Sequence, residues 1–582
     1  MLPLAQAPWM TAWLTPIWFL AMGVAMGLVG LGILVIIFRG LSAIPGWDDL
    51  TQGPAGHVIA LVITAVLTGA IWYLLPDSFK SNPDKPDLNE PLLLAISLSL
   101  ICAVVGWSLV FCSRSQPARN AFATLTDGAA GYLGIAALVV IFVGASVWGI
   151  GLAMGTPIVD SPIKALTSIP QLFSTGDQTF KTTVPGTPAG EVGEFVQVPT
   201  EIDFDLLTSL SIVSDTTVYL ADAEKTSSFR RSPIRLGAAE VLEWKSTQNL
   251  SELPIPTQPD SSLYVQNQEV SPTVISIVAV TRPPVPESAS LLITAIVVML
   301  IGLAILLQQA VAPRLSAVAY ATTTNEVAQP LFLVLMALGT LAILVYLMLP
   351  FFTFGEDVKI LKENGITTIM LLAAFQGIWS ASSSISEEIE GKTALTVLSK
   401  PIQRRSFVIG KFMGIFWMLL LMFVILGLIE LAAVAYKPIY DAREASKGDV
   451  FWQACHAEMM ATIPGLALAF MQAVTLTAVS VALATRLPQL ANLSVCMAIY
   501  LIGNLSTAMI SSTQYAFDIV KFIAQLIATV IPILEHFQLQ AAIDGDKPIT
   551  MSLLSGSLVY CLLYVLLAMF LALLLFEDRD LA

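Results

Sequence analysis

Long apolar runs recur along almost the whole chain, and they constrain the fold more than any other feature. Each run is about 20 residues long, which is enough for one α-helix to cross a hydrocarbon core of about 30 Å. Helices are required because lipid offers no hydrogen-bond partners to exposed backbone groups. Of the 582 residues, 56% are hydrophobic and 12% are charged, whereas soluble domains usually carry about 25% charged residues. The sequence therefore predicts an all-α polytopic membrane protein.

The apolar runs predict about eleven transmembrane helices. The predicted spans are residues 17–38, 57–75, 91–112, 129–153, 290–310, 331–350, 366–384, 407–436, 462–484, 489–510 and 553–576. The first run is interpreted as a span rather than a signal peptide, because no basic residue precedes it and no small-residue cleavage site follows it.

Residues 154–289 interrupt the apolar pattern with Pro, Thr, Ser and acidic residues. They contain short runs of β-forming residues, which are Phe195–Val198, Thr217–Leu220, Leu263–Val265 and Thr273–Val280. About 130 residues can form a small independent core, so we expect an inserted β-rich domain in which 176–193 and 246–262 are loops. The alternative is an extended loop throughout. The expected organisation is then a four-span region (1–153), the β-rich domain (154–289) and a second membrane region (290–582).

Residues 385–411 form a charge-dense island between two apolar runs. Three acidic residues come first and five basic residues follow: Glu387, Glu388, Glu390, then Lys392, Lys400, Arg404, Arg405 and Lys411. Between them Leu395, Leu398 and Ile402 recur at spacings of three and four, which predicts one apolar face of a short helix. Pro401 should interrupt or kink this helix. Such a segment at the membrane surface suits docking to a soluble protein; the alternative is a charged loop that only orients its neighbours.

This island resembles the coupling segment of the permease subunits of type 2 ABC transporters. The positions that carry the resemblance are Glu387, Glu388, Glu390, Gly391, Thr393, Pro401, Arg404, Arg405, Gly410 and Lys411. The resemblance extends more loosely over residues 310–576. It implies that the segment faces the cytosol and contacts a separate ATP-binding subunit, with Lys392, Leu395 and Leu398 also in the contact. It further implies an elbow helix at 312–329 and a pair of short helices at 515–543, for which a single poor transmembrane helix is the alternative.

Other chemistry is not indicated. Gly391-Lys392-Thr393 is not a phosphate-binding loop, because that motif needs a glycine where Ser386 stands and a strand before it. We therefore expect no ATP-binding site and no enzymatic activity in this chain, and neither a cofactor nor a metal. The segment Cys455–Glu458 lacks the second His or Cys pair of a closed zinc site. A net charge of −14 argues against a nucleic-acid partner.

Glu430 is the one carboxylate well inside a predicted span. Ionisable groups in such positions usually face a cavity or a partner. Glu430 could instead extend toward the outer membrane interface, six residues away at Tyr436. The interfacial position is the favoured interpretation, and a position along an export pathway is the alternative.

The local density of basic residues in 392–411, together with the resemblance, which implies that this segment faces the cytosol, predicts a topology with the N-terminus outside. With 385–406 inside, eleven basic residues lie in the cytosolic loops and nine in the outer loops other than 154–289. This agrees with the positive-inside rule, and it leaves the β-rich domain outside and the C-terminus in the cytosol of a bacterial inner membrane.

These features together predict the permease subunit of an ATP-driven exporter, working as a homodimer or with a related permease, surrounded by lipid. The substrate is not specified. One alternative is a mechanotransmitting complex that acts on a partner outside the membrane through residues 154–289. A secondary transporter is disfavoured, since it needs ion or substrate groups at mid-membrane, and few charges lie there.

Overall fold

The computed structural model describes most of the chain and divides it into two units. The described residues are 8–74, 89–154, 158–159, 162–173, 175–188, 193–198, 206–225, 228–229, 232–245, 263–349, 356–387, 403–512, 519, 522, 526, 531–537 and 551–577. The first unit comprises Met1–Asp160 with Ile293–Ala582, and the second comprises Ser161–Leu292. Each unit has its own apolar core.

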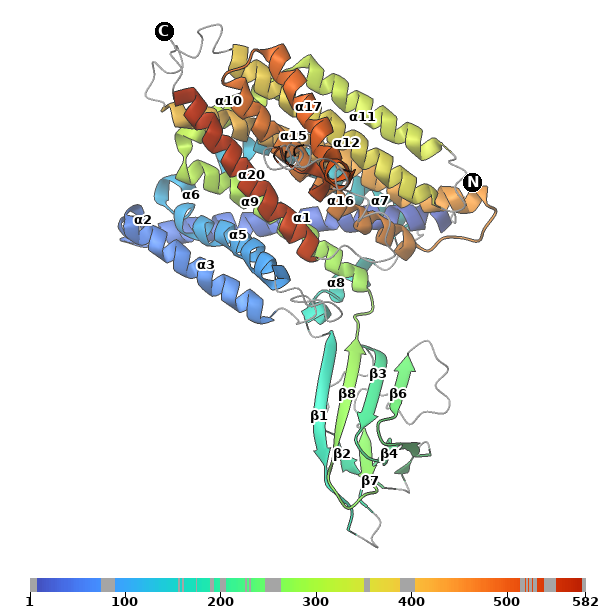
Figure 1. Ribbon diagram of the computed structural model, residues 1–582. Helices are drawn as coiled ribbons and strands as arrows, with labels where there is room; N and C mark the ends of the chain where they lie inside the picture. The colour runs from blue at the N-terminus through green and yellow to red at the C-terminus, as the bar shows by residue number, and fades with distance from the viewer. Residues whose placement is uncertain are drawn as a thin grey trace. The chain divides into compact units, whose positions relative to one another are not determined.

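The first unit is built from α-helices, most of them long (Figure 1). Its helices are α1 (Pro8–Ser42), α2 (Trp47–Gln52), α3 (Pro54–Leu74), α5 (Asn89–Phe111), α6 (Ser115–Thr126), α7 (Gly128–Met154), α9 (Ala289–Val311), α10 (Pro313–Ala328), α11 (Pro330–Met348), α12 (Asp357–Ala381), α15 (Arg404–Glu444), α16 (Trp452–Ala484), α17 (Gln489–Ser512) and α20 (Met551–Glu577). Proline is the first residue of α3, α10 and α11, where its missing N–H removes no helical hydrogen bond.

Helices α12, α15, α16 and α20 pack around the largest apolar core of this unit (Figure 1). Buried side chains from all four helices contribute to it, including Ile369, Met418, Ala473 and Phe576. In a bilayer, helices associate through close van der Waals packing and interhelical hydrogen bonds, because lipid tails are as apolar as the side chains themselves.

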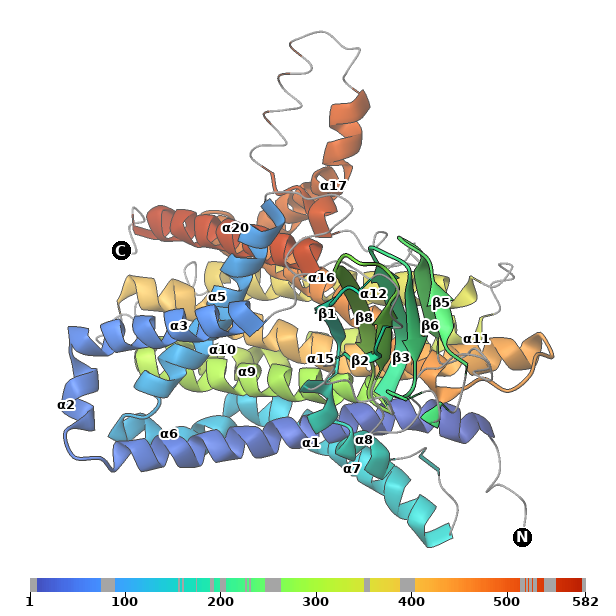
Figure 2. The ribbon, with the colours of Figure 1, turned by 90° about the horizontal axis from the view of Figure 1, so that it is seen from below.

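Small residues bring two of these helices into close contact. Gly410 and Gly414 lie one turn apart on α15 and face α10, and the two helices pack against each other (Figure 2). A Cβ atom at Gly414 would lie 2.6 Å from the Cβ of Thr322 and 2.7 Å from the backbone oxygen of Ala319. Two glycines at this spacing let helix backbones approach closely, so α10 is held directly against the start of α15.

Ten helices in the described part of the chain are long and apolar enough to cross a membrane. They are α1, α3, α5, α7, α9, α11, α12, α15, α16 and α20. Ten of the predicted spans lie in these helices. The eleventh, 489–510, lies in α17, whose apolar part Gln489–Leu505 is shorter than the rest. The predicted fold class, a polytopic helical protein with a β-rich insertion, is confirmed.

Two segments were expected to lie at the membrane surface. A helix is present over the first, 312–329, as α10. Most of the second, 515–543, lies outside the described residues; its described part includes one short 3₁₀ turn, Leu534–Phe537. The phenol of Tyr560 on α20 accepts a hydrogen bond from the backbone N–H of Ile533 at 3.0 Å, which attaches this turn to α20.

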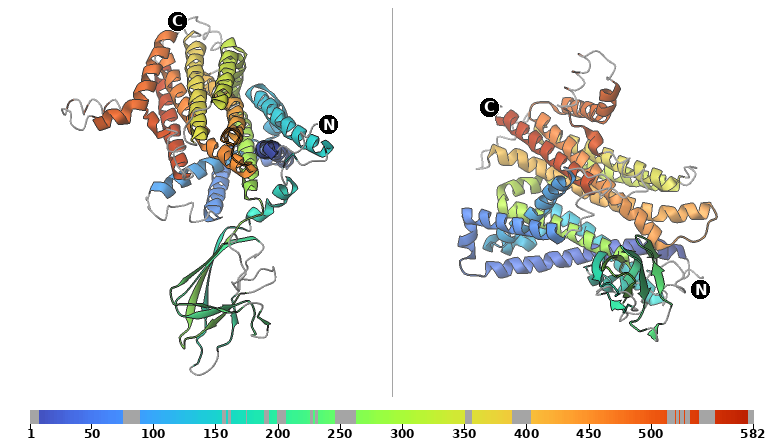
Figure 3. Two further views of the ribbon diagram at one scale, coloured as in Figure 1. Left: turned by 90° about the vertical axis from the view of Figure 1, so that its right-hand side faces the viewer. Right: turned by 60° about the horizontal axis from the view of Figure 1, so that its bottom comes forward.

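The second unit is a sandwich of two four-stranded antiparallel sheets (Figure 3). Its strands are β1 (Asp177–Val184), β2 (Val196–Gln197), β3 (Leu207–Ser214), β4 (Val218–Ala221), β5 (Ile234–Leu236), β6 (Val241–Lys245), β7 (Tyr264–Asn267) and β8 (Thr273–Thr281). The sheet orders are β1-β8-β3-β6 and β2-β7-β4-β5. The short helix α8 (Pro162–Thr167) precedes the first strand.

Strand β8 shows how the sandwich buries its apolar residues. Ile275, Ile277 and Ala279 are buried in the core, whereas Val274 and Val278, on the opposite face of the strand, are exposed. This alternation follows from the two-residue period of a strand, which sends successive side chains to opposite faces.

The prediction of a loop over residues 176–193 of this unit is wrong. Residues 176–193 contain β1, which pairs with β8 along its whole length, from Asp177 opposite Val280 to Val184 opposite Thr273. The segment is rich in polar residues and has a weak strand signal of its own, so pairing with a central strand decides its conformation. The other expected loop, 246–262, lies outside the described residues.

Candidate functional site

The candidate site is the pair of helix ends that flank the charged island. Helix α12 leads into the island and α15 leads out of it. On the α12 side the described residues end with Ser382–Glu387, a π-helical turn that continues α12 into the start of the island. Such turns are rare and often occur at functional positions. Of the residues assigned to ATPase contact, Glu388, Glu390, Gly391, Lys392, Thr393, Leu395, Leu398 and Pro401 lie outside the described residues.

Buried hydrogen bonds join the end of α12 to α10. The hydroxyl of Ser380 donates to Oε2 of Glu326 at 2.6 Å, and Nε2 of Gln376 donates to the Ser380 hydroxyl at 3.1 Å. All three side chains are buried. A buried carboxylate is costly without hydrogen-bond donors, so this contact ties α10 to α12 about one turn before the island.

A second buried group joins the same helix end to α16 and α17. Nδ2 of Asn492 on α17 donates to the hydroxyl of Ser382 at 2.7 Å and to the hydroxyl of Ser480 on α16 at 2.9 Å. Ser382 belongs to the π-helical turn. Any movement of that turn therefore breaks or carries with it contacts to α16 and α17.

The exit from the island is attached to α20. Arg404 and Arg405 are exposed in the first turn of α15, and Nη1 of Arg404 donates to the backbone oxygen of Glu577 at 3.1 Å. The ring of Phe407 stacks on Phe576 with centroids 6.0 Å apart. The ammonium of Lys411 lies 5.6 Å from the centroid of the Phe407 ring. The structure thus describes three of the assigned contact residues at one end of the island, and Glu387 at the other.

Glu430 lies well away from these contacts along α15. Its side chain is fully buried, and neither carboxylate oxygen has a hydrogen-bond partner among the described residues. It packs against Gly365 of α12, where an added Cβ would lie 2.2 Å from Glu430 Oε2. Lys362, one turn earlier on α12, pairs with Glu458 of α16 at 2.5 Å. The carboxylate therefore points into the helix bundle, unlike a side chain extended to the interface.

Glu326, Ser380, Ser382 and Asn492 were not identified from the sequence. Glu326 and Ser380 are 54 residues apart, and Ser382 and Asn492 are 110 apart. Their local signal is weak: each is a polar side chain in or beside a membrane helix, where such groups often form interhelical hydrogen bonds.

Comparison with known proteins finds a family that is similar to the C-terminal region of the chain. Residues 351–581 match the family model described as ABC-2 family transporter protein. No curated protein and no solved structure matches the chain. The matched region contains α12, the charged island, α15, α16, α17 and α20, which are most of the elements that build the candidate site. With ten helices able to span a bilayer among its described residues, the chain is a multi-pass membrane protein, and its C-terminal region, residues 351–581, is similar to transporter permeases of the ABC-2 family.

Proposed function

We propose that this permease works with a separate ATPase subunit and that residues 385–411 are the docking segment. The observation that carries the proposal is the construction of the two helix ends around that segment. One end is hydrogen-bonded to α10, α16 and α17, and the other to α20. A force on the segment would therefore act on four other helices at once.

In this proposal ATP binding and hydrolysis by the partner move the docking segment. The π-helical turn at Ser382–Glu387 is the element that absorbs the movement, since its hydrogen-bonding pattern departs from that of the α-helix before it. The polar contacts of Ser380 and Ser382 then transmit it into the membrane region. The outcome is export of a substrate through a path between two permease copies, or between this chain and a related permease.

The family supports transport over the mechanotransmitting alternative, because a transporter permease is what the matched region resembles. Glu430 is the candidate for a residue of the transport path, as a buried carboxylate without a described hydrogen-bond partner. The proposed setting is a bacterial inner membrane, with the β-sandwich outside and the docking segment in the cytosol.

The test of this function is ATP hydrolysis by the purified chain and by its complex. We expect the chain alone to release no phosphate from ATP above a detergent blank, and an ATP-binding polypeptide to copurify with it from its native membrane. Hydrolysis by the chain alone, free of any second polypeptide, would contradict the proposal.

Sidedness is tested by cysteine labelling. The five native cysteines are all buried, so an introduced thiol should dominate the signal. We expect Ser271→Cys in the β-sandwich to react with an impermeant maleimide on intact cells, and Gln403→Cys to react only after lysis. Both positions are exposed. The reverse pattern would reject the orientation and, with it, the cytosolic docking segment.

A further inference from the structure

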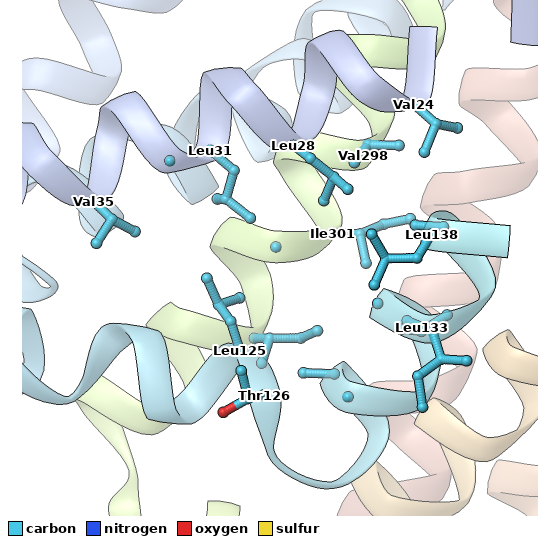
Figure 4. A pocket seen from close by; sticks show the side chains of 18 of the residues that line it. Val24, Leu28, Leu31, Val35, Leu125, Thr126, Leu133, Leu138, Val298 and Ile301 are labelled. Carbon is cyan, nitrogen blue, oxygen red and sulfur yellow. The ribbon is translucent and has the colours of Figure 1, made fainter. Parts of the chain in front are cut away.

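A large apolar cavity lies among the helices of the first unit, away from the candidate site. It has a volume of about 910 Å³ and is bounded by α1, α6, α7, α9 and α15 (Figure 4). Leu28 and Leu31 of α1, Leu133 and Leu138 of α7 and Ile301 of α9 line it. Its volume is near the upper end of the range for small-molecule pockets, about 300–1,000 Å³.

The cavity is a product of how these helices are held apart. Helices α1 and α7 touch at Ala21 and Gly144, where an added Cβ would lie 2.3 Å from the Cβ of Ala21. Beyond that contact the chain enters α7 from α6 at Gly128, whose φ of +57° favours glycine. Because of this turn, α6 is a separate helix that bounds the cavity and is not an extension of α7 along α1.

Helix α6 is itself fixed at its start. Oδ1 of Asp48 accepts a hydrogen bond from the backbone N–H of Ser115 at 2.9 Å. Hydrogen bonds from Ser115 are the main reason that the pKa of Asp48 is lowered. The indole of Trp47 donates to the hydroxyl of Ser113 at 2.9 Å. These contacts hold the wall formed by α6 in place, so the cavity is a defined space.

The cavity is open to the outside of the helix bundle. Ile36, Phe122 and Leu138 line it and are 69%, 69% and 62% exposed. Ile36 and Leu138 belong to α1 and α7, which are long and apolar enough to span a membrane, and exposed apolar side chains on such helices face lipid tails. The α1 residues that line the cavity run from Val24 to Arg39, about 22 Å at 1.5 Å per residue. That length exceeds one leaflet of the hydrocarbon core, about 15 Å.

One end of the cavity carries a positive charge. Among the described residues that line it, Arg39 is the one charged residue and Thr126 the one other polar residue. Arg39 lies in the last turn of α1, and its Nε donates to the backbone oxygen of Ala118 at 3.3 Å. That bond orients a guanidinium group, whose planar set of N–H donors matches phosphate oxygens.

We propose that this cavity is a binding site for an anionic phospholipid, with an acyl chain between α1, α7 and α9 and the headgroup phosphate at Arg39. The apolar lining accounts for the chain and the single cation for the headgroup. The site lies largely in the N-terminal helices, outside the region matched by the ABC-2 family model, and it does not depend on docking of an ATPase.

The test uses a phospholipid with a diazirine in its acyl chain, in anionic and zwitterionic forms, together with native mass spectrometry of the protein in detergent. Gly134→Leu should fill the cavity, because Gly134 lines it and an added Cβ there meets nothing within 4 Å. Gly149→Leu on the same helix is the matched control, since Gly149 has the same free space and does not line the cavity. We expect about tenfold less retained lipid for the first variant and no loss for the second.

The headgroup contact is tested by Arg39→Gln, with Arg119→Gln as its control. Arg119 also donates its Nε to a backbone oxygen, that of Ser115 at 3.0 Å, but does not line the cavity. We expect only Arg39→Gln to lose the preference for the anionic lipid, by about fivefold, the effect of one cation near an anionic lipid surface. Crosslinks of the acyl diazirine should fall on Leu133, Leu138 or Val298. Retention by Gly134→Leu equal to that of the unmodified chain, or crosslinks confined to the outer faces of the helices, would overturn the site.

Discussion

Replacing both Leu395 and Leu398 with Asp should strongly weaken copurification of the ATPase subunit. Both leucines lie on the predicted apolar face of the docking segment, and loss of a buried interface anchor commonly costs about 2 kcal/mol or more. An unpaired carboxylate in an apolar contact adds a desolvation penalty. We expect binding to weaken by at least about 30-fold, measured by the ratio of ATPase to permease after affinity purification.

The control for this variant introduces the same charges elsewhere. Val241 and Val270 are 53% and 68% exposed in the β-sandwich, so the double variant Val241→Asp, Val270→Asp should retain its ATPase in full. The spans should survive in both variants, because their stability comes from lipid and helix packing. An ATPase ratio equal to that of the unmodified chain in the Leu395→Asp, Leu398→Asp variant would show that the docking segment is elsewhere.

Gly414→Ala should destabilise the helix bundle even though alanine is the better helix former. The new Cβ would lie within 2.7 Å of Thr322 and of the Ala319 backbone oxygen. Helix α10 would have to move, because backbone atoms cannot turn aside as a flexible side chain does. Overpacking of this kind costs about 1–3 kcal/mol. We expect a lower midpoint of thermal unfolding in detergent and less ATP hydrolysis in the reconstituted complex.

Gly427→Ala on the same helix is the matched comparison. Its nearest neighbour would be Cδ1 of Leu466 at 3.4 Å, an ordinary contact. Because alanine is favoured over glycine in a helix by about 1 kcal/mol, this variant should unfold at the same temperature or higher. Equal unfolding midpoints for the two variants would show that the close approach of α10 and α15 does not contribute to the stability of the helix bundle.

The helices could be predicted from sequence because the signal is local. A run of about 20 apolar residues has one stable arrangement in lipid whatever its neighbours are. The ends of the helices could be predicted less well from the sequence. Helix α12 begins at Asp357 instead of residue 366, and its early residues Lys362 and Gly365 are buried by α15 and α16. Their place in a helix depends on partners that lie far along the chain.

The strands of the β-sandwich, too, were predicted only in part from the sequence. The runs rich in Val, Ile and Tyr were recognised, and they became β2, β4, β7 and β8. Strands β1 and β3 were missed, although both pair with β8 over most of their lengths. The sequence of β1 is mostly polar, and in β3 the apolar residues are interspersed with Ser and Thr. The choice between strand and loop is made by a neighbouring strand 60 to 100 residues away, as in the pairing of Ser214 with Ile275 and of Asp177 with Val280.

The candidate site shows the same division most clearly. Composition and charge order by themselves determined a membrane-spanning chain with a charged island, because apolar length and charge density are properties of contiguous residues. Tertiary structure alone decided that Glu326 meets Ser380, that Asn492 meets Ser382, and that Arg39 lies at the end of an apolar cavity. Each of these contacts joins residues from different helices, and the packing of those helices depends on side-chain shapes that no local pattern encodes.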